Sequence, residues 1–137
     1  MDIQRQPKLE FKGINIIRTS FNARRMYNFE ENMDLNVDAK LVAPTSEDSF
    51  QILMNVSLSV QNCFNLEVVG VGNFDLSNDL EGEERQDFIN INAPAIMFPY
   101  LRAFIATFSA NCGETLPKLI IPPHFFKGDL DIMESNK

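Results

Sequence analysis

Side chains that commonly carry chemistry are scarce in this sequence of 137 residues. It contains one histidine, His124, and two cysteines, Cys63 and Cys112, which stand far apart in the chain. A structural zinc site needs about four nitrogen or sulfur ligands at short spacing, so we expect no metal site. One disulfide is possible by count, but we expect both cysteines to be small buried apolar side chains in a reducing compartment. His124 has no nucleophile or acid beside it in sequence, which favours a packing or capping role over catalysis.

Motifs for nucleotide binding or acid–base chemistry are incomplete. The segment Gly70-Val-Gly-Asn-Phe-Asp75 begins like a dinucleotide-binding fingerprint, but it lacks the third glycine and the helix that must follow at once. The glycine-rich phosphate loop that ends in Gly-Lys-Ser or Gly-Lys-Thr does not occur in the sequence. Glu83 and Glu84 stand beside Arg85 in a polar run, which is typical of the solvated start of a helix. We therefore expect no catalytic residues, no enzymatic activity and no cofactor.

Two segments between expected elements are rich in apolar side chains, although loops are usually polar. They are Met26–Phe29 and Leu116–Phe126, the second of which contains three prolines. One interpretation is that they plug the core beneath a loop. The other is a groove, because proline-stiffened backbone bordered by large apolar side chains would accept many extended peptides without a polar code. In the second interpretation the candidate peptide-binding residues are Met26, Tyr27, Phe29, Leu116, Leu119, Ile121 and Phe125.

Alternating apolar and polar residues predict antiparallel strands with one wet face. The alternation breaks at Gly13 and around Ile16, so the first strand is irregular. Gly70 and Gly72 indicate a bulge or a close approach of another backbone or side chain. Only three residues separate the last two strands, which predicts a hairpin. The four expected strands lie within residues 9–23, 33–41, 50–60 and 64–76.

A long apolar helix is expected after the strands. We expect Asn92 to cap it, Pro94 to occupy its first turn and Gly113 to end it after Cys112. Fourteen of its twenty residues are hydrophobic and Arg102 is its only charge. Such a helix is long enough to span a bilayer. We do not expect it to do so, because an arginine at its centre would cost about 2.5 to 3.5 kcal/mol in lipid.

A single sheet can cover only one side of this helix, and the other side then needs a second cover. We expect that cover to be another subunit, so the protein should be an obligate oligomer. The candidate interface residues on the helix are Phe98, Leu101, Phe104, Ile105 and Phe108.

Composition and charge narrow the class of protein further. With 45% hydrophobic and 23% charged residues, the chain fits one domain over 1–137, with flexible ends at 1–8 and 129–137. The net charge of −7 disfavours binding to nucleic acid or to anionic lipid, because both would repel it. The first residues contain no secretory signal, which favours a cytoplasmic protein.

Three stretches carry a family resemblance. Pro94-Ala-Ile-Met-Phe-Pro-Tyr-Leu-Arg102 and the segment Leu116–Phe125 resemble the SecB family of protein-export chaperones, which has a Phe-Pro-Tyr helix start and a proline-rich loop. The segment Cys63–Phe74 is similar to the family's third and fourth strands. The resemblance covers about residues 9 to 130.

The resemblance implies an α+β fold: a four-stranded antiparallel sheet followed by a long helix and a short C-terminal helix after Phe126. It also implies a homotetramer, built as a dimer of dimers, that binds unfolded or precursor polypeptides without ATP. The family contacts the translocation motor SecA through acidic residues, of which Glu67 matches one, whereas Arg18 and Asn22 stand where others are expected. Some relatives serve a toxin–antitoxin pair, which is the alternative function. A third and less favoured function is that of an enzyme or carrier for a small hydrophobic ligand, with His124 at the rim of its groove.

Overall fold

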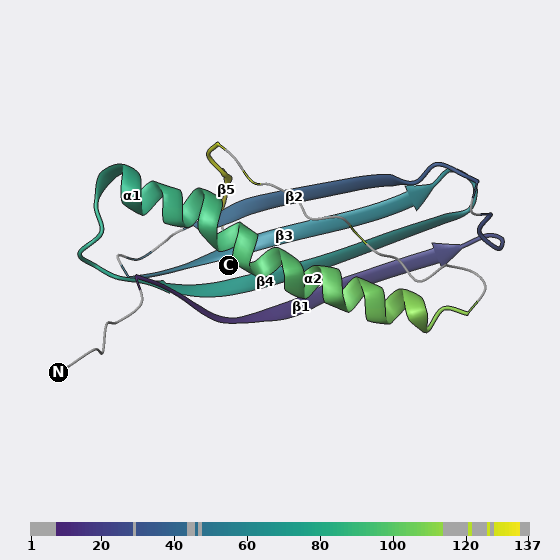
Figure 1. Cartoon of the computed structure of the whole chain (residues 1–137), viewed down its shortest axis with the longest axis horizontal. Helices are drawn as coiled ribbons and strands as arrows, with labels where there is room; N and C mark the ends of the chain where they lie inside the picture. Colours follow the sequence, from purple (N-terminus) through teal and green to yellow (C-terminus); the bar gives the residue numbers. More distant parts are fainter. Residues whose placement is uncertain are drawn as a thin grey trace.

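The computed structural model describes residues 8–28, 30–43, 46, 48–113, 121, 126 and 128–134. One long helical rod lies obliquely across one face of a twisted sheet, so the molecule has two layers (Figure 1). The described elements are β1 (Leu9–Ala23), β2 (Asp34–Ala43), β3 (Ser49–Val60), β4 (Phe64–Leu76), α1 (Gly82–Asp87), the π-helical turn η1 (Phe88–Asn92), α2 (Ala93–Ala110) and β5 (Asp131–Glu134).

The sheet has the strand order β1-β4-β3-β2-β5. The first four strands pair antiparallel, which confirms the four strands predicted from the alternation. The hairpin between β3 and β4 closes with Val60 opposite Phe64, and Asn62 adopts a positive φ of 61° in its turn. Asparagine tolerates this left-handed backbone better than most residues do.

Strand β1 is an edge strand with two irregularities. Its register against β4 shifts between Phe11 and Gly13 and again between Ile16 and Arg18. These are the places where the sequence alternation breaks, so that prediction is confirmed. Gly13 has a φ of +123°, and Ile17 is 57% exposed at the second irregularity. Bulges of this kind twist an edge strand and interrupt its pairing surface.

The core lies between α2 and the inner face of β3 and β4. Two glycines of β4 let the helix approach closely, as the sequence predicts. A Cβ at Gly70 would lie 3.1 Å from Leu101 Cδ2, and one at Gly72 would lie 3.0 Å from Met97 Sδ. The inner face and the helix together bury the large side chains Ile52, Met54, Val56, Phe64, Leu66, Val68, Phe74, Met97, Leu101 and Ile105.

The helical rod begins ten residues before the predicted start. Gly82 opens α1 with a φ of +60°, and Glu83 and Glu84 occupy the first turn, where negative charge stabilises the helix dipole. This confirms the solvated helix start predicted for the two glutamates. Asn92 does not cap the helix, because its backbone is helical and its side chain makes no cap hydrogen bond. The π-helical turn η1 precedes Pro94, whose missing N–H interrupts the regular hydrogen-bond ladder there.

The C-terminal segment also differs from the prediction. Asp131–Glu134 forms β5, which pairs parallel with Lys40–Ala43 of β2, instead of a short helix or a flexible end. No such helix occurs within the described part of the chain after Ala110. The tertiary pairing with β2 decides the conformation here, because four residues are too few to specify a strand by themselves.

The rod from Gly82 to Ala110 is 29 residues long, and its mean hydropathy reaches 1.2 over a window of eighteen residues. By length and composition alone, this helical rod is long and apolar enough to cross a membrane. Core helices of soluble proteins meet the same criterion, and α2 packs Met97, Leu101 and Ile105 against its own sheet.

Candidate polypeptide-binding site

Residues 24–33 connect β1 to β2, and we call them the crossover loop. A bidentate ion pair between Arg25 and Glu31 links two parts of this loop. Arg25 Nη1 donates to Glu31 Oε1 at 2.6 Å, and Nη2 donates to Oε2 at 2.6 Å. The hydrogen bonds from Arg25 lower the pKa of Glu31 below its ordinary value of 4.5, and they raise the pKa of Arg25. The backbone N–H of Asn28 adds a bond of 3.2 Å to Glu31 Oε1. A forked pair fixes geometry better than a single contact does.

The same loop is fastened to the β3–β4 hairpin. The Tyr27 ring packs edge-on against Phe64, with ring centroids 5.9 Å apart, and its hydroxyl donates to the Glu31 carbonyl at 3.0 Å. The Arg24 N–H donates to the Cys63 carbonyl at 2.8 Å, while the Cys63 thiol points back to the loop carbonyls at 3.7 and 3.8 Å. These contacts join the loop backbone to the hairpin.

The predicted peptide-binding residues fall into different environments. Met26 is 60% exposed, and Tyr27 is half-buried and packs against the core. We call these two side chains the apolar wall of the crossover loop. Ile121 is only 3% exposed and lies within the core cluster, where it acts as a plug. The other predicted peptide-binding residues lie outside the described part of the chain: Phe29, Leu116, Leu119 and Phe125. His124 also lies outside it.

The helix has one face on the sheet and one face in solvent. Phe98, Leu101 and Ile105, which the sequence placed at a subunit contact, are at most 3% exposed within the single chain. Leu101 lies against Gly70 of β4, and the Phe98 ring packs edge-on against Phe126. Phe104 and Phe108 are half-buried at the boundary. The solvent face is mostly apolar, and its one charged residue in α2 is the partly exposed Arg102. The exposed uncharged residues on this face are Ile91, Ala95, Ile96, Pro99, Tyr100, Ala103 and Thr107.

The outer face of the sheet places Glu67 beside a basic residue. Arg18 Nε lies 3.4 Å from Glu67 Oε1, and Asn55 Nδ2 donates to Oε2 at 3.0 Å. The Glu67 side chain is 33% exposed, so part of its charge faces solvent but is neutralised locally. The Asn55 side-chain oxygen is buried, and among the residues that the structure describes it has no hydrogen-bond partner.

Cys63 and Cys112 do not form a disulfide with each other. Cys63 is 1% exposed, as predicted, whereas Cys112 is half-buried at the end of α2. Burial raises the pKa of the Cys112 thiol. Within the described ranges, no group of three or more histidine, cysteine, aspartate or glutamate residues lies close enough to hold a metal ion.

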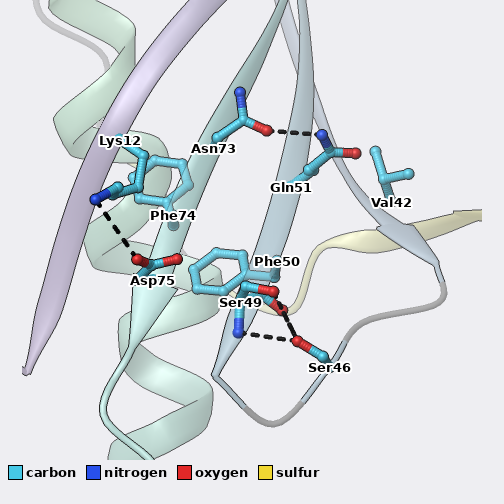
Figure 2. A pocket seen from close by; sticks show the side chains of 9 residues that line it. All are labelled: Lys12, Val42, Ser46, Ser49, Phe50, Gln51, Asn73, Phe74 and Asp75. Carbon is cyan, nitrogen blue, oxygen red and sulfur yellow. Dashed lines mark hydrogen bonds and ion pairs between the residues drawn. The ribbon is translucent and has the colours of Figure 1, made fainter.

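A cavity of about 430 Å³ lies at one end of the sheet, away from the crossover loop (Figure 2). Its polar groups pair with one another: Gln51 Nε2 donates to Asn73 Oδ1 at 2.7 Å, and Lys12 Nζ lies 3.8 Å from Asp75. None of the predicted site residues lines it, and its polar side chains are already engaged. It is lined by Lys12, Val42, Ser46, Ser49, Phe50, Gln51, Asn73, Phe74 and Asp75.

Comparison with known proteins identifies relatives of the chain. The sequence profile described as "Preprotein translocase subunit SecB" matches residues 4–128. The protein-export protein SecB of Orientia tsutsugamushi (strain Boryong) is 30% identical over 117 residues, which cover 82% of this chain and 69% of that protein. The protein-export protein SecB of Rickettsia felis is 26% identical over 97 residues, covering 68% and 62%.

Solved structures share the fold. A SecB-like chaperone of Mycobacterium tuberculosis, in complex with a peptide from the HigA1 antitoxin, matches with a TM-score of 0.67 at 15% identity. The match covers 85% of this chain and 88% of that one. A protein of unknown function from Streptococcus agalactiae matches with a TM-score of 0.51 at 14% identity, covering 83% and 96%. The resemblance found in the sequence is thereby confirmed.

Proposed function

The chain belongs to the SecB family of chaperones, and from that membership we propose that it is an ATP-independent holdase of the cytoplasm. It would bind unfolded or precursor polypeptides and keep them from aggregating. The proposal needs no catalytic group and no cofactor, because holding a chain in the unfolded state requires only reversible contacts.

The observation that carries the proposal is the apolar wall of the crossover loop. Met26 is 60% exposed on a backbone that the Arg25–Glu31 pair and the Tyr27 hydroxyl already fix. Burying one large apolar side chain contributes about 1.5 to 3 kcal/mol, and micromolar affinity corresponds to about 8 kcal/mol. Several such contacts suffice when the site is ordered in advance, because less conformational entropy is lost on binding.

The solvent face of α2 supports assembly into a homotetramer, a dimer of dimers. Ile96 is 39% exposed and Tyr100 is 52% exposed on a largely apolar face whose one charged residue in α2 is the partly exposed Arg102, and water disfavours such a face over this length. We infer that a second copy of this chain covers it, because identical faces of this kind are self-complementary around a two-fold axis.

A dedicated chaperone for one cognate partner, such as an antitoxin, is the second candidate. Arg18 neutralises Glu67, the acidic residue through which the family would contact the motor SecA, so export coupling through this face would be weak. The fold is shared with a mycobacterial SecB-like chaperone solved with an antitoxin peptide. Purification from native cells would then yield one dominant partner, whereas a general or export chaperone would yield a mixture of clients.

The test of peptide binding uses three single substitutions in the crossover loop. Met26→Asp and Tyr27→Asp place a charge on the apolar wall and should weaken binding to a chemically denatured client. Asn32→Asp, at an exposed position of the same loop, is the matched control and should leave affinity unchanged. Equal affinity for all three variants and the native chain would show that the wall does not contact clients.

A further inference from the structure

Another cavity, of about 210 Å³, lies where the β3–β4 hairpin meets the end of β1. This end of the sheet is the one opposite α1 (Figure 1). We call it the hairpin cavity. Three of the residues that line it are buried: Val60, Cys63 and Phe64. The other four described lining residues are exposed and polar: Asn22, Arg24, Asn62 and Asn65.

Strand pairing brings two of the polar side chains together. Asn22 of β1 lies directly opposite Asn65 of β4. Opposite residues of an antiparallel pair point to the same side of the sheet, with their Cβ atoms about 4.5 to 5.5 Å apart. That side is the outer face, because Phe64 and Leu66, on either side of Asn65, are buried in the core. The two carboxamides therefore stand next to each other on the face that points away from α2.

The hairpin turn adds the other two polar side chains. The Arg24 N–H donates to the Cys63 carbonyl at 2.8 Å, so the backbone of Arg24 is fixed against the turn. Asn62 precedes Cys63 and adopts the left-handed backbone of the turn, with a φ of 61°. Two separate segments of the chain thus supply one guanidinium and three carboxamides to a single cavity.

These polar groups differ from those of the larger cavity in Figure 2. There, Gln51 donates to Asn73, and Lys12 pairs with Asp75. In the hairpin cavity, none of the four polar side chains forms a hydrogen bond or ion pair with another described residue. A guanidinium carries five N–H donors and a carboxamide carries two. The hairpin cavity therefore offers donors to a group from outside the chain.

The local charge of the hairpin cavity is positive, although the chain has a net charge of −7. Among the described residues, Arg24 has no acidic partner, and no lining residue is acidic. The Debye length at physiological salt is about 8 Å, so distant acidic groups are largely screened there. Five other basic side chains lie within 4.0 Å of an acidic side chain: Lys8, Lys12, Arg18, Arg25 and Lys40.

Size and charge together select the kind of occupant. Sites for whole small molecules usually have volumes of about 300 to 1,000 Å³, so a cavity of about 210 Å³ suits a single inserted side chain better. A guanidinium binds a carboxylate through a planar fork of two hydrogen bonds. One unpaired arginine does not suit nucleic acid, whose binding depends on many phosphate contacts. The fitting occupant is an aspartate or glutamate of a polypeptide.

We propose that the hairpin cavity binds an acidic segment of a partner polypeptide, one carboxylate of which enters the cavity and pairs with Arg24. This site goes beyond the proposed function, because Met26 and Tyr27, the apolar wall, do not line it. Its charge preference is also the reverse of that of an acidic face. Asn22 stands where the family resemblance places an acidic residue, and a carboxylate at that position would repel the proposed occupant.

The test compares two labelled peptides, one of alternating glutamate and glycine and one of alternating glutamine and glycine. Fluorescence anisotropy with the full chain measures both affinities, and their ratio reports the preference for a carboxylate. The glutamate peptide should bind about fivefold more tightly, which corresponds to about 1 kcal/mol for an ion pair at an exposed site. Equal binding of the two peptides, or no binding of either, would overturn the proposal.

Four variants locate the preference. Arg24→Gln should reduce the ratio to about one, and Arg24→Lys should keep only about twofold, because an ammonium cannot form the fork. Asn65→Asp should also reduce the ratio, since it places a carboxylate in the cavity. Lys12→Gln removes the same charge from the other end of β1 and should leave the ratio unchanged. An equal loss in Lys12→Gln and Arg24→Gln would mean that only net charge matters, which would refute the site.

Competition identifies the source of the carboxylate. Free glutarate at the concentration of the glutamate peptide should not displace it, because a segment of chain also contacts the surface around the cavity. Displacement by equimolar glutarate would assign the cavity to a small dicarboxylate and overturn the polypeptide as its occupant. Circular dichroism verifies that each variant is folded, and Asn65→Asp, at an exposed position, supplies an independent test if Arg24→Gln does not fold.

Discussion

Replacing Ile96 with serine should weaken self-association by an amount that its exposure sets. Ile96 is 39% exposed in the single chain, and full burial of such a side chain contributes about 1.5 to 3 kcal/mol. Covering the remaining exposed part therefore contributes about 1 kcal/mol in each copy. A two-fold contact contains the change twice, which gives about 2 kcal/mol, or about a thirtyfold rise in the dissociation constant.

Sedimentation equilibrium over a range of concentrations measures that constant. Leu35→Ser is the matched control, because Leu35 is 36% exposed but lies on β2, away from the helix. It should leave self-association unchanged. The reasoning is refuted if Ile96→Ser associates as tightly as the native chain, or if the native chain is a stable folded monomer at micromolar concentration.

Three further changes test the packing of the fold and loop. Gly70→Val should lower the free energy of unfolding by about 1 to 3 kcal/mol, measured with denaturant. The reason is that a Cβ at this position would lie 3.0 Å from Ile14 Cδ1 and 3.1 Å from Leu101 Cδ2. An unchanged free energy of unfolding would mean that α2 does not pack against β4. Tyr27→Phe should lower stability by about 0.5 to 1.5 kcal/mol through loss of its bond to the Glu31 carbonyl, and no loss would indicate that water replaces it. Because the pKa of Glu31 is lowered in the folded state, its stabilising contribution is present above pH 4.5 and is lost as pH falls below that value. Glu31→Gln should therefore flatten that part of the pH–stability curve, and an unaltered acid limb would argue against the Arg25 pair.

The four long strands could be read from the sequence because each has one buried face. Residues 64–76 alternate except around Val69 to Gly72, and they form β4 over the same range. The breaks at Gly13 and Ile16 likewise became register shifts in β1. The two glycines of β4 indicated a close approach, although the partner that approaches, α2, could be known only from the fold.

Three features could not be read in this way. Asn92 followed by Ala93 and Pro94 has the pattern of a helix start, but the π-helical turn carries the helix through it. A helix that is apolar on all sides has no polar face that would show which side packs against the core. The sequence therefore could not show that Phe98, Leu101 and Ile105 are buried within the single chain. Strand β5 depends on pairing with a distant strand, and local pattern does not encode such pairing.

The candidate site was found in part. Apolar residues in a loop identified the crossover loop, because loops are otherwise polar. The ion pair of Arg25 and Glu31, which orders that loop, spans six residues and resembles any surface pair in the sequence.

The most direct test of the account is whether the purified chain, without nucleotide, suppresses the aggregation of a denatured client. Light scattering of a client diluted from guanidinium should fall to baseline when the chaperone assembly equals the client in concentration. Adding ATP should change nothing. Scattering that is unaffected by the chain at this ratio would contradict the central claim that it holds unfolded polypeptides.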